Sequence, residues 1–181
     1  MKKLMLGTAK WTNWVDCYKL LDNWPENGLI DCATNYPING EPDDFRLSEA
    51  ILINYLKDSE KKFRINMKVG ALTNNRSIEN DLSPENLSIW ADFYREKFGE
   101  NLDCLMIHWD NRLDEFEIAE TYCKLSTICY EFGIRIGLSG LKSIRIYESL
   151  FEKLEVGNVQ FQVKYSEIDR YEKLLKGNHL Q

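Results

Sequence analysis

Four side chains with complementary proton chemistry lie near the ends of short apolar runs in the sequence. Asp31 and Lys68 close two such runs, His108 closes a third, and Tyr36 follows Asp31 by five residues. A free phenol has a pKa of about 10, which is too high for efficient proton exchange at neutral pH. A nearby ammonium group stabilises the phenolate and lowers that pKa. These residue types therefore suit the transfer of a proton to or from an oxygen atom.

Each of the four side chains has a separate expected task. Lys68 is expected to lower the pKa of Tyr36, and Asp31 to pair with Lys68 so that the lysine stays charged despite partial burial. His108 is expected to hydrogen-bond the oxygen of a bound carbonyl or alcohol. A single Asp or Lys at a strand end is more often part of a surface salt bridge, and a lone histidine is more often structural. The agreement of four residue types favours a site.

Apolar runs alternate with helical periodicities along the chain, which predicts alternating strands and helices. Strands are expected over residues 4–9, 28–31, 63–69, 102–109, 134–138 and 159–165. Helices are expected over residues 14–24, 45–55, 84–98, 114–132, 142–154 and 171–176. The strongest start signal is Ser83-Pro84-Glu85, where a capping serine precedes a proline and an acid. Asp43-Asp44 is expected to cap the second helix.

Strands that alternate with helices predict a parallel sheet covered by helices. Asp31, Lys68, His108 and Ser139 recur at intervals of 31 to 40 residues, so each falls at the carboxyl end of a strand. This is the edge where α/β barrels and doubly wound sheets place their sites. No G-x-G-x-x-G follows the first strand, which argues against a Rossmann fold. The expected fold class is α/β, a (β/α)8 TIM-barrel type with about six β/α units.

Composition narrows the range of partners. The chain has 181 residues and a formal charge of −6, which predicts one domain over residues 1–181 and disfavours nucleic acid and anionic membranes as partners. Lys2-Lys3 and the short apolar run after it do not make a signal peptide, so a cytoplasmic location is expected. The five cysteines form no C-x-x-C pair and no metal-binding spacing. Reduced thiols and no metal site are expected.

The sequence resembles the aldo-keto reductases, barrel enzymes that use NADPH without a Rossmann fold. The segment from Gly28 to Tyr36 is similar to the family's G-x-x-x-D-T-A-x-x-Y signature, and Ser48-Glu49 to its Ser-Glu pair. The other matching segments are Met67-Lys68-Val69-Gly70, Leu105-Met106-Ile107-His108-Trp109, Gly137-Leu138-Ser139-Gly140 and the run from Gln162 to Arg170. These motifs occur in one order over nearly the whole chain.

The resemblance implies a role for each matching position. Tyr36 would be the general acid/base, Lys68 and Asp31 would tune it, and His108 would orient the substrate. The implied cofactor is NADPH (NADP), and the implied substrate is a small aldehyde or ketone, sugar-related carbonyls included. The implied cofactor-binding residues are Gly7, Thr8, Asp31, Ser139 and Gln162. The implied substrate-binding residues are Trp11, His108 and Trp109.

Three departures from the family pattern bear on these expectations. Gly140 stands where the family has an asparagine, and Pro37 where it has a glycine. Only six β/α units are predicted, whereas a complete barrel has eight, so the last two units are expected to be missing. The open sheet edge leaves an alternative, a non-catalytic remnant that acts, if at all, through homo-oligomerisation or a partner covering that edge.

Overall fold

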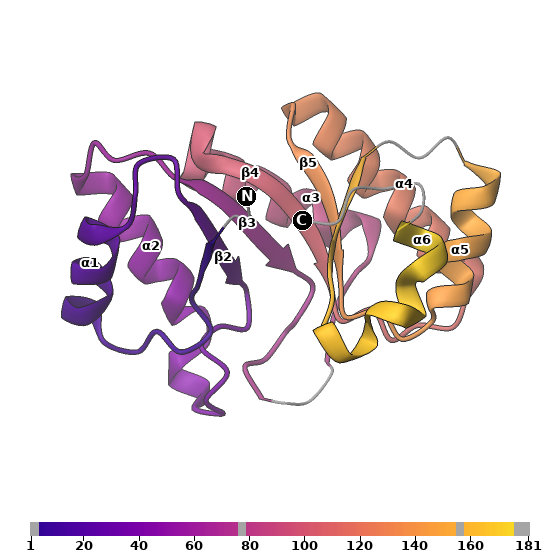
Figure 1. The fold of residues 1–181 in the computed structure, drawn as a ribbon, viewed down its shortest axis with the longest axis horizontal. Helices are drawn as coiled ribbons and strands as arrows, with labels where there is room; N and C mark the ends of the chain where they lie inside the picture. Colours follow the sequence, from indigo (N-terminus) through magenta and orange to yellow (C-terminus); the bar gives the residue numbers. More distant parts are fainter. Residues whose placement is uncertain (1–3, 76–78, 155–157, 176–181) are drawn as a thin grey trace.

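In the part of the chain that the structure describes, six strands form one parallel sheet in the order in which they occur in the sequence (Figure 1). The computed structural model describes residues 4–75, 79–154 and 158–175. The strands are β1 (Met5–Gly7), β2 (Leu29–Ala33), β3 (Arg64–Val69), β4 (Leu102–His108), β5 (Arg135–Ser139) and β6 (Val159–Gln162). Each strand pairs in parallel with the next, as successive strand–helix units require. The predicted α/β class is confirmed.

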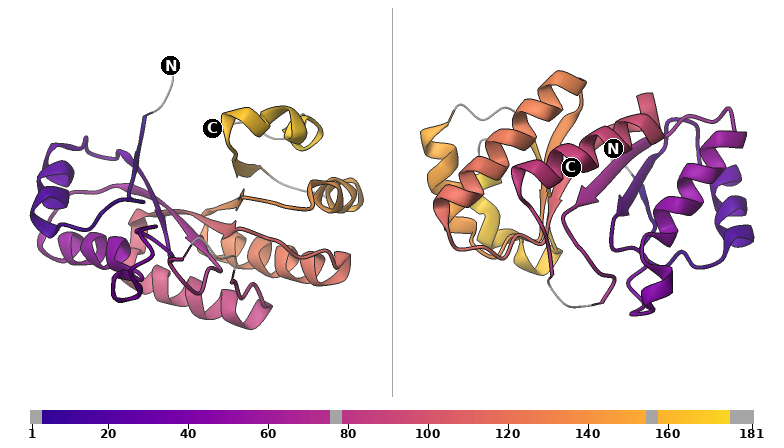
Figure 2. Two further views of the ribbon diagram at one scale, coloured as in Figure 1. Left: turned by 90° about the horizontal axis from the view of Figure 1, so that it is seen from below. Right: turned by 180° about the vertical axis from the view of Figure 1, so that it is seen from behind.

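Helices connect the strands and cover the outer face of the sheet (Figure 2). The α-helices are α1 (Trp14–Asn23), α2 (Leu47–Asp58), α3 (Pro84–Phe98), α4 (Glu115–Phe132), α5 (Ile144–Lys153) and α6 (Glu172–Leu175). The described residues also form three 3-10 helices, η1 (Pro42–Asp44), η2 (Gly99–Asn101) and η3 (Tyr165–Tyr171). The sheet curls into a half-barrel with the carboxyl ends of its strands at one rim, and this confirms the incomplete barrel expected from the sequence.

The cap predicted at Ser83 forms, and Asp114, predicted as the first residue of the next long helix, caps that helix instead. The Ser83 hydroxyl accepts a hydrogen bond from the N–H of Asn86 at 3.3 Å, and Pro84 is the first residue of α3. The Asp114 carboxylate accepts from the N–H groups of Phe116 and Glu117 at 2.8 and 3.0 Å. These side chains satisfy N–H groups that have no partner inside the helix.

Several predicted element boundaries differ from the structure by a few residues, and two are wrong because a different element begins there. Asp43 and Asp44 do not cap α2; they belong to η1, where Pro42 begins a tighter turn, and α2 starts only after Arg46, whose φ is 67°. β6 ends at Gln162 rather than at residue 165, because the backbone turns into η3 there. The predicted end of the last helix at Lys176 and part of the loop before α3 lie outside the described residues.

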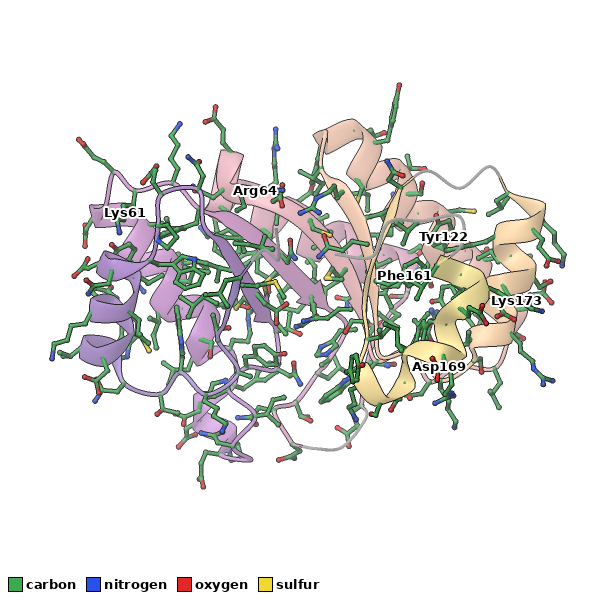
Figure 3. All side chains as sticks on the ribbon, viewed as in Figure 1. Lys61, Arg64, Tyr122, Phe161, Asp169 and Lys173 are labelled. Atoms are coloured by element: carbon green, nitrogen blue, oxygen red, sulfur yellow. The ribbon has the colours of Figure 1, made fainter. Side chains whose placement is uncertain are left out.

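A series of aromatic side chains in contact with one another extends the core outward from β6. Phe161 lies 6.2 Å from Phe151 and 6.4 Å from Tyr171, measured between ring centroids, and Phe151 lies 5.1 Å from Tyr122. Figure 3 shows Tyr122 and Phe161 on the side of the molecule where α4 and α5 lie. This packing fixes β6, the last strand of the described sheet, against the helices beside it.

A buried polar cluster holds the start of α2 against α3. Glu49 is 2 % exposed, pairs with Arg46, and accepts a hydrogen bond from the Tyr94 hydroxyl at 2.6 Å. The next residue toward the N-terminus, Ser48, donates to the Thr8 carbonyl at 2.8 Å. The cluster therefore ties α2 both to α3 and to the loop that follows β1.

We predict that Tyr94→Phe lowers the free energy of unfolding by about 1–3 kcal/mol, because the Glu49 carboxylate loses a buried donor. The measurement is urea unfolding followed by circular dichroism. Tyr130→Phe, at a side chain that is 88 % exposed, is the matched control and leaves the midpoint unchanged. Equal stability of Tyr94→Phe and the parent chain would contradict this account.

Candidate active site

A buried ion pair joins β2 to β3 at the rim of the half-barrel. Lys68 Nζ donates to Asp31 Oδ2 at 2.6 Å, and the two side chains are 2 % and 7 % exposed. Burial alone acts to lower the pKa of Lys68, but the negative charge of Asp31 and then the Tyr36 side chain outweigh it, so that the pKa is raised. Lys68 is therefore an ammonium ion at neutral pH, as expected from the sequence.

Tyr36 lies beside this pair in the loop after β2. Its N–H donates to the Ala33 carbonyl at 3.1 Å, its carbonyl accepts from the Ser48 N–H at 3.2 Å, and its ring centroid lies 4.9 Å from Lys68 Nζ. The start of α2 thus helps to place the phenol.

Lys68 acts to lower the pKa of Tyr36, as the sequence predicts, but burial has the larger and opposite effect. Burial raises the pKa of Tyr36 above its ordinary value, and the positive charge of Lys68 opposes this shift without cancelling it. The side chain is 7 % exposed, so loss of hydration of the phenolate is the larger effect. Tyr36 stays protonated at neutral pH and is available as an acid.

His108 completes the group from the end of β4. Its ring stands edge-on to Tyr36 at 6.2 Å between centroids and lies 4.6 Å from the Trp109 ring. Burial, and then the positive charge of Lys68, hold the pKa of His108 well below its usual value, so the imidazole is neutral at pH 7. No described residue hydrogen-bonds its buried Nδ1. A neutral imidazole can donate from one nitrogen and accept at the other.

One cleft of about 450 Å³ brings most of the predicted site residues together. It is lined by Tyr36, Lys68, His108, Trp109, Ser139 and Gln162. Asp31 lies behind this layer, in contact with Lys68. The cleft is also lined by residues that sequence reasoning missed, among them Asn111, Lys142, Lys164 and Glu167. Lys142 lies two residues after Gly140, the neighbour of Ser139, and Lys164 lies two residues after Gln162. This proximity to predicted site positions is the signal in the sequence that could have identified both lysines.

Besides Asp31, three predicted site residues lie outside the lining of this cleft. Gly7 ends β1, and Thr8 is fully buried with its hydroxyl donating to the Asp31 carbonyl at 3.0 Å. Trp11 is 5 % exposed and packs in the hydrophobic core. Thr8 therefore supports Asp31 from behind, and the structure does not bring Trp11 to the cleft.

Gly140 has a structural reason to differ from the family's asparagine. Its φ is +70°, and a Cβ atom there would lie 2.5 Å from Cδ1 of Trp109. Trp109 itself has a φ of 59°, and its carbonyl accepts from the Asn111 side chain at 2.9 Å. The indole ring therefore occupies the space that a side chain at position 140 would need.

Other kinds of site have little support in the described part of the chain. Among these residues no group of three or more His, Cys, Asp or Glu side chains is placed to hold a metal ion. The five cysteines are free thiols, and burial raises the pKa of Cys32 to about 12. No described helix has both the length and the apolar character needed to cross a membrane.

We predict that His108 stays neutral as the pH falls through its ordinary midpoint of about 6.5. In the unfolded chain the same imidazole takes up a proton near that pH, so acidification through this range lowers the free energy of unfolding. Two-dimensional NMR of the imidazole resonances, with His108→Asn for assignment, measures the titration. A His108 midpoint at its ordinary value would contradict the described burial.

Comparison with known proteins agrees with this geometry. A sequence model described as "Aldo/keto reductase family" matches residues 3–177. No curated protein matches the chain. An aldo/keto reductase from Brucella melitensis superposes with a TM-score of 0.64 at 16% identity over 97% of this chain and 65% of its own. A protein from Pseudomonas aeruginosa described as an aldo-keto reductase gives 0.64 at 23% identity, with coverages of 92% and 64%.

An aldo-keto reductase from Klebsiella pneumoniae, solved in complex with NADPH, gives a TM-score of 0.55 at 15% identity. The match covers 93% of this chain and 60% of the Klebsiella pneumoniae protein. The chain thus spans 60–65% of the length of these solved structures that have its fold. With a family match over nearly its whole length and the same half-barrel, the chain belongs to the aldo/keto reductase family.

Proposed function

We propose that this chain reduces a small aldehyde or ketone to an alcohol with NADPH, Tyr36 being the proton donor. The observation that carries the proposal is the buried ammonium of Lys68, 2.6 Å from Asp31 and 4.9 Å from the Tyr36 ring centroid, in a cleft that His108 also lines. Sugar-related carbonyls are one substrate class that such a cleft suits, because hydroxyl groups can meet its polar wall.

The residues of the cleft suit a nicotinamide cofactor. Ser139 and Gln162 line it from the ends of β5 and β6, and each carries a side-chain group able to hydrogen-bond a carboxamide. When bound, the reduced cofactor supplies a hydride to the carbonyl carbon. Because Gly140 carries no side chain, Ser139 and Gln162 would hold the carboxamide without the family's asparagine.

The chain's own residues handle the oxygen end of the substrate. His108 donates a hydrogen bond to the carbonyl oxygen and orients it, since a neutral imidazole retains one N–H. Tyr36 gives its proton to that oxygen as the C=O double bond becomes a C–O single bond, and the phenolate that remains is stabilised by Lys68. Asp31 holds the ammonium in place throughout. Water then returns the proton to Tyr36.

Positive side chains near the cleft favour an anionic cofactor. Lys142 lines the cleft and also a neighbouring groove of about 600 Å³. That groove is further lined by Arg145, Arg170 and Lys173, with Glu148 as the one acid in its lining. The whole chain carries a charge of −6, so this concentration of positive charge is local. It supports the binding of the cofactor's phosphate groups on this side of the cleft.

We predict that Tyr36→Phe lowers kcat for carbonyl reduction by roughly 10²–10⁴-fold and leaves the NADPH dissociation constant within about twofold. The phenylalanine fills the same space but has no proton to give. The measurements are the decrease in NADPH absorbance across a panel of aldehydes and ketones, and NADPH binding by fluorescence quenching. Unchanged turnover in Tyr36→Phe would exclude this residue as the acid.

We also predict that NADPH binding weakens as salt is raised from about 0.05 to 0.5 M, because exposed charges are screened over a few ångströms at the higher concentration. Arg145→Glu is expected to weaken NADPH binding about tenfold. Lys153→Glu, on the same helix but paired with Glu115, is the control and has little effect. Salt-independent binding, or equal losses in the two variants, would place the phosphates elsewhere.

The alternative, a non-catalytic protein that acts through an interface, draws support from the edges of the sheet. Among the described residues β1 pairs only with β2, and β6 pairs only with β5. Unpaired strand edges are covered in most proteins. A folded chain that forms a defined oligomer by size-exclusion chromatography and binds no NADPH would favour this function over reduction.

A further inference from the structure

Gln162 contacts the buried ammonium of the site directly. Its Oε1 accepts a hydrogen bond from Lys68 Nζ at 3.0 Å, although Gln162 lies on β6 and Lys68 on β3, with β4 and β5 between them in the sheet. The contact therefore spans the concave face of the half-barrel. It is the curl of the sheet that brings the two side chains within reach.

This contact uses one of the three directions in which the ammonium can donate. A lysine side chain has three N–H donors and no acceptor. One donor is directed to Asp31 Oδ2 at 2.6 Å and a second to Gln162 Oε1 at 3.0 Å. With two tetrahedral directions fixed, the third is fixed as well. The Tyr36 ring lies beside the ammonium, with its centroid 4.9 Å from Nζ.

We propose that Gln162 is a positioning residue that, together with Asp31, fixes the Lys68 ammonium so that it faces Tyr36. The inference deepens the proposed function, because Tyr36 is the acid that this arrangement serves. It also gives Gln162 a task in the cofactor-free protein, in addition to the carboxamide contact that its family position implies. The side chain acts through Lys68 and touches no reacting atom.

Gln162 also links the occupant of the cleft to the acidity of Tyr36. Since its Oε1 is held by Lys68, its amide N–H groups remain for a hydrogen-bond acceptor in the cleft. A ligand carbonyl held there polarises the same amide whose oxygen holds Lys68. Occupancy of the cofactor position is thereby transmitted to the Lys68–Tyr36 pair through one side chain.

The ionisable groups that act on Tyr36 and Lys68 come from the elements packed around them. Asp31 and Cys32 lie on β2, and His108 lies on β4. β6 contributes the neutral amide of Gln162. Replacing Gln162 by another neutral residue therefore changes the position of the ammonium without adding or removing a charge, which makes the Tyr36 titration a direct readout of positioning.

The test is the ionisation of Tyr36 in the cofactor-free protein, followed by tyrosinate absorbance. Subtracting the titration of the corresponding Tyr36→Phe protein isolates this residue from the other eight of the nine tyrosines. In Gln162→Met, which has similar length but no amide oxygen, the midpoint moves to higher pH because Lys68 is less well directed. Gln162→Asn keeps the amide but is too short to reach, and it shifts the midpoint in the same direction.

Gln160→Met is the matched control. Gln160 lies two residues earlier on β6, so it points to the same face of the sheet, and it is 6 % exposed. The Gln160→Met substitution is expected to leave the midpoint of the Tyr36 titration unchanged. Circular dichroism at each pH verifies that all variants are folded, and if Gln162→Met fails to fold, Gln162→Asn decides the question.

An unchanged Tyr36 midpoint in folded Gln162→Met or Gln162→Asn would overturn the proposal. If NADPH affinity alone then fell, Gln162 would be a cofactor contact only. Under the proposal, Gln162→Met also lowers kcat by roughly tenfold at saturating NADPH, as expected when a charge-assisted hydrogen bond is lost. Because the titration needs neither cofactor nor substrate, its result is independent of whether the chain reduces carbonyls.

Discussion

The ion pair between Asp31 and Lys68 is the constraint on which the rest of the site depends. Both side chains are almost fully buried, and removing either partner would leave an uncompensated charge at a cost of about 3–5 kcal/mol. The pair is supported from several sides. Thr8 bonds the Asp31 carbonyl, and Gln162 bonds the Lys68 ammonium from across the half-barrel. The loop after the first strand and the last strand of the described sheet thus both contribute to its position.

Burial, more than the charge of Lys68, sets the protonation states of Tyr36 and His108 beside the ion pair. Burial raises the pKa of Tyr36 and lowers the pKa of His108, and in each case the uncharged form is favoured. The charge of Lys68 adds to the shift of His108 and opposes that of Tyr36. Tyr36 is consequently a protonated acid and His108 a neutral hydrogen-bond donor, which are the states that the reduction of a carbonyl requires.

Sequence reasoning anticipated that Tyr36, Lys68 and His108 lie together, because parallel strands bring their carboxyl ends to one rim and polar residues that close successive strands meet there. It could not give the net pKa of Tyr36, which depends on how completely the loop buries the phenol. It also placed Trp11 at the substrate, whereas its side chain packs in the core. The positive groove beside the cleft was missed because Lys142, Arg145, Arg170 and Lys173 come from two separate segments, whose proximity the sequence does not reveal.

The proposed reduction requires that a nicotinamide cofactor occupies the cleft formed by Tyr36, His108 and Gln162, although the chain spans 60–65% of the related solved structures. A crystal structure of the chain grown with NADP+ tests it most directly. We expect difference density for the nicotinamide against Ser139 and Gln162, with the phosphates toward Lys142. An empty cleft at saturating NADP+, or the dinucleotide bound at another surface, would contradict it.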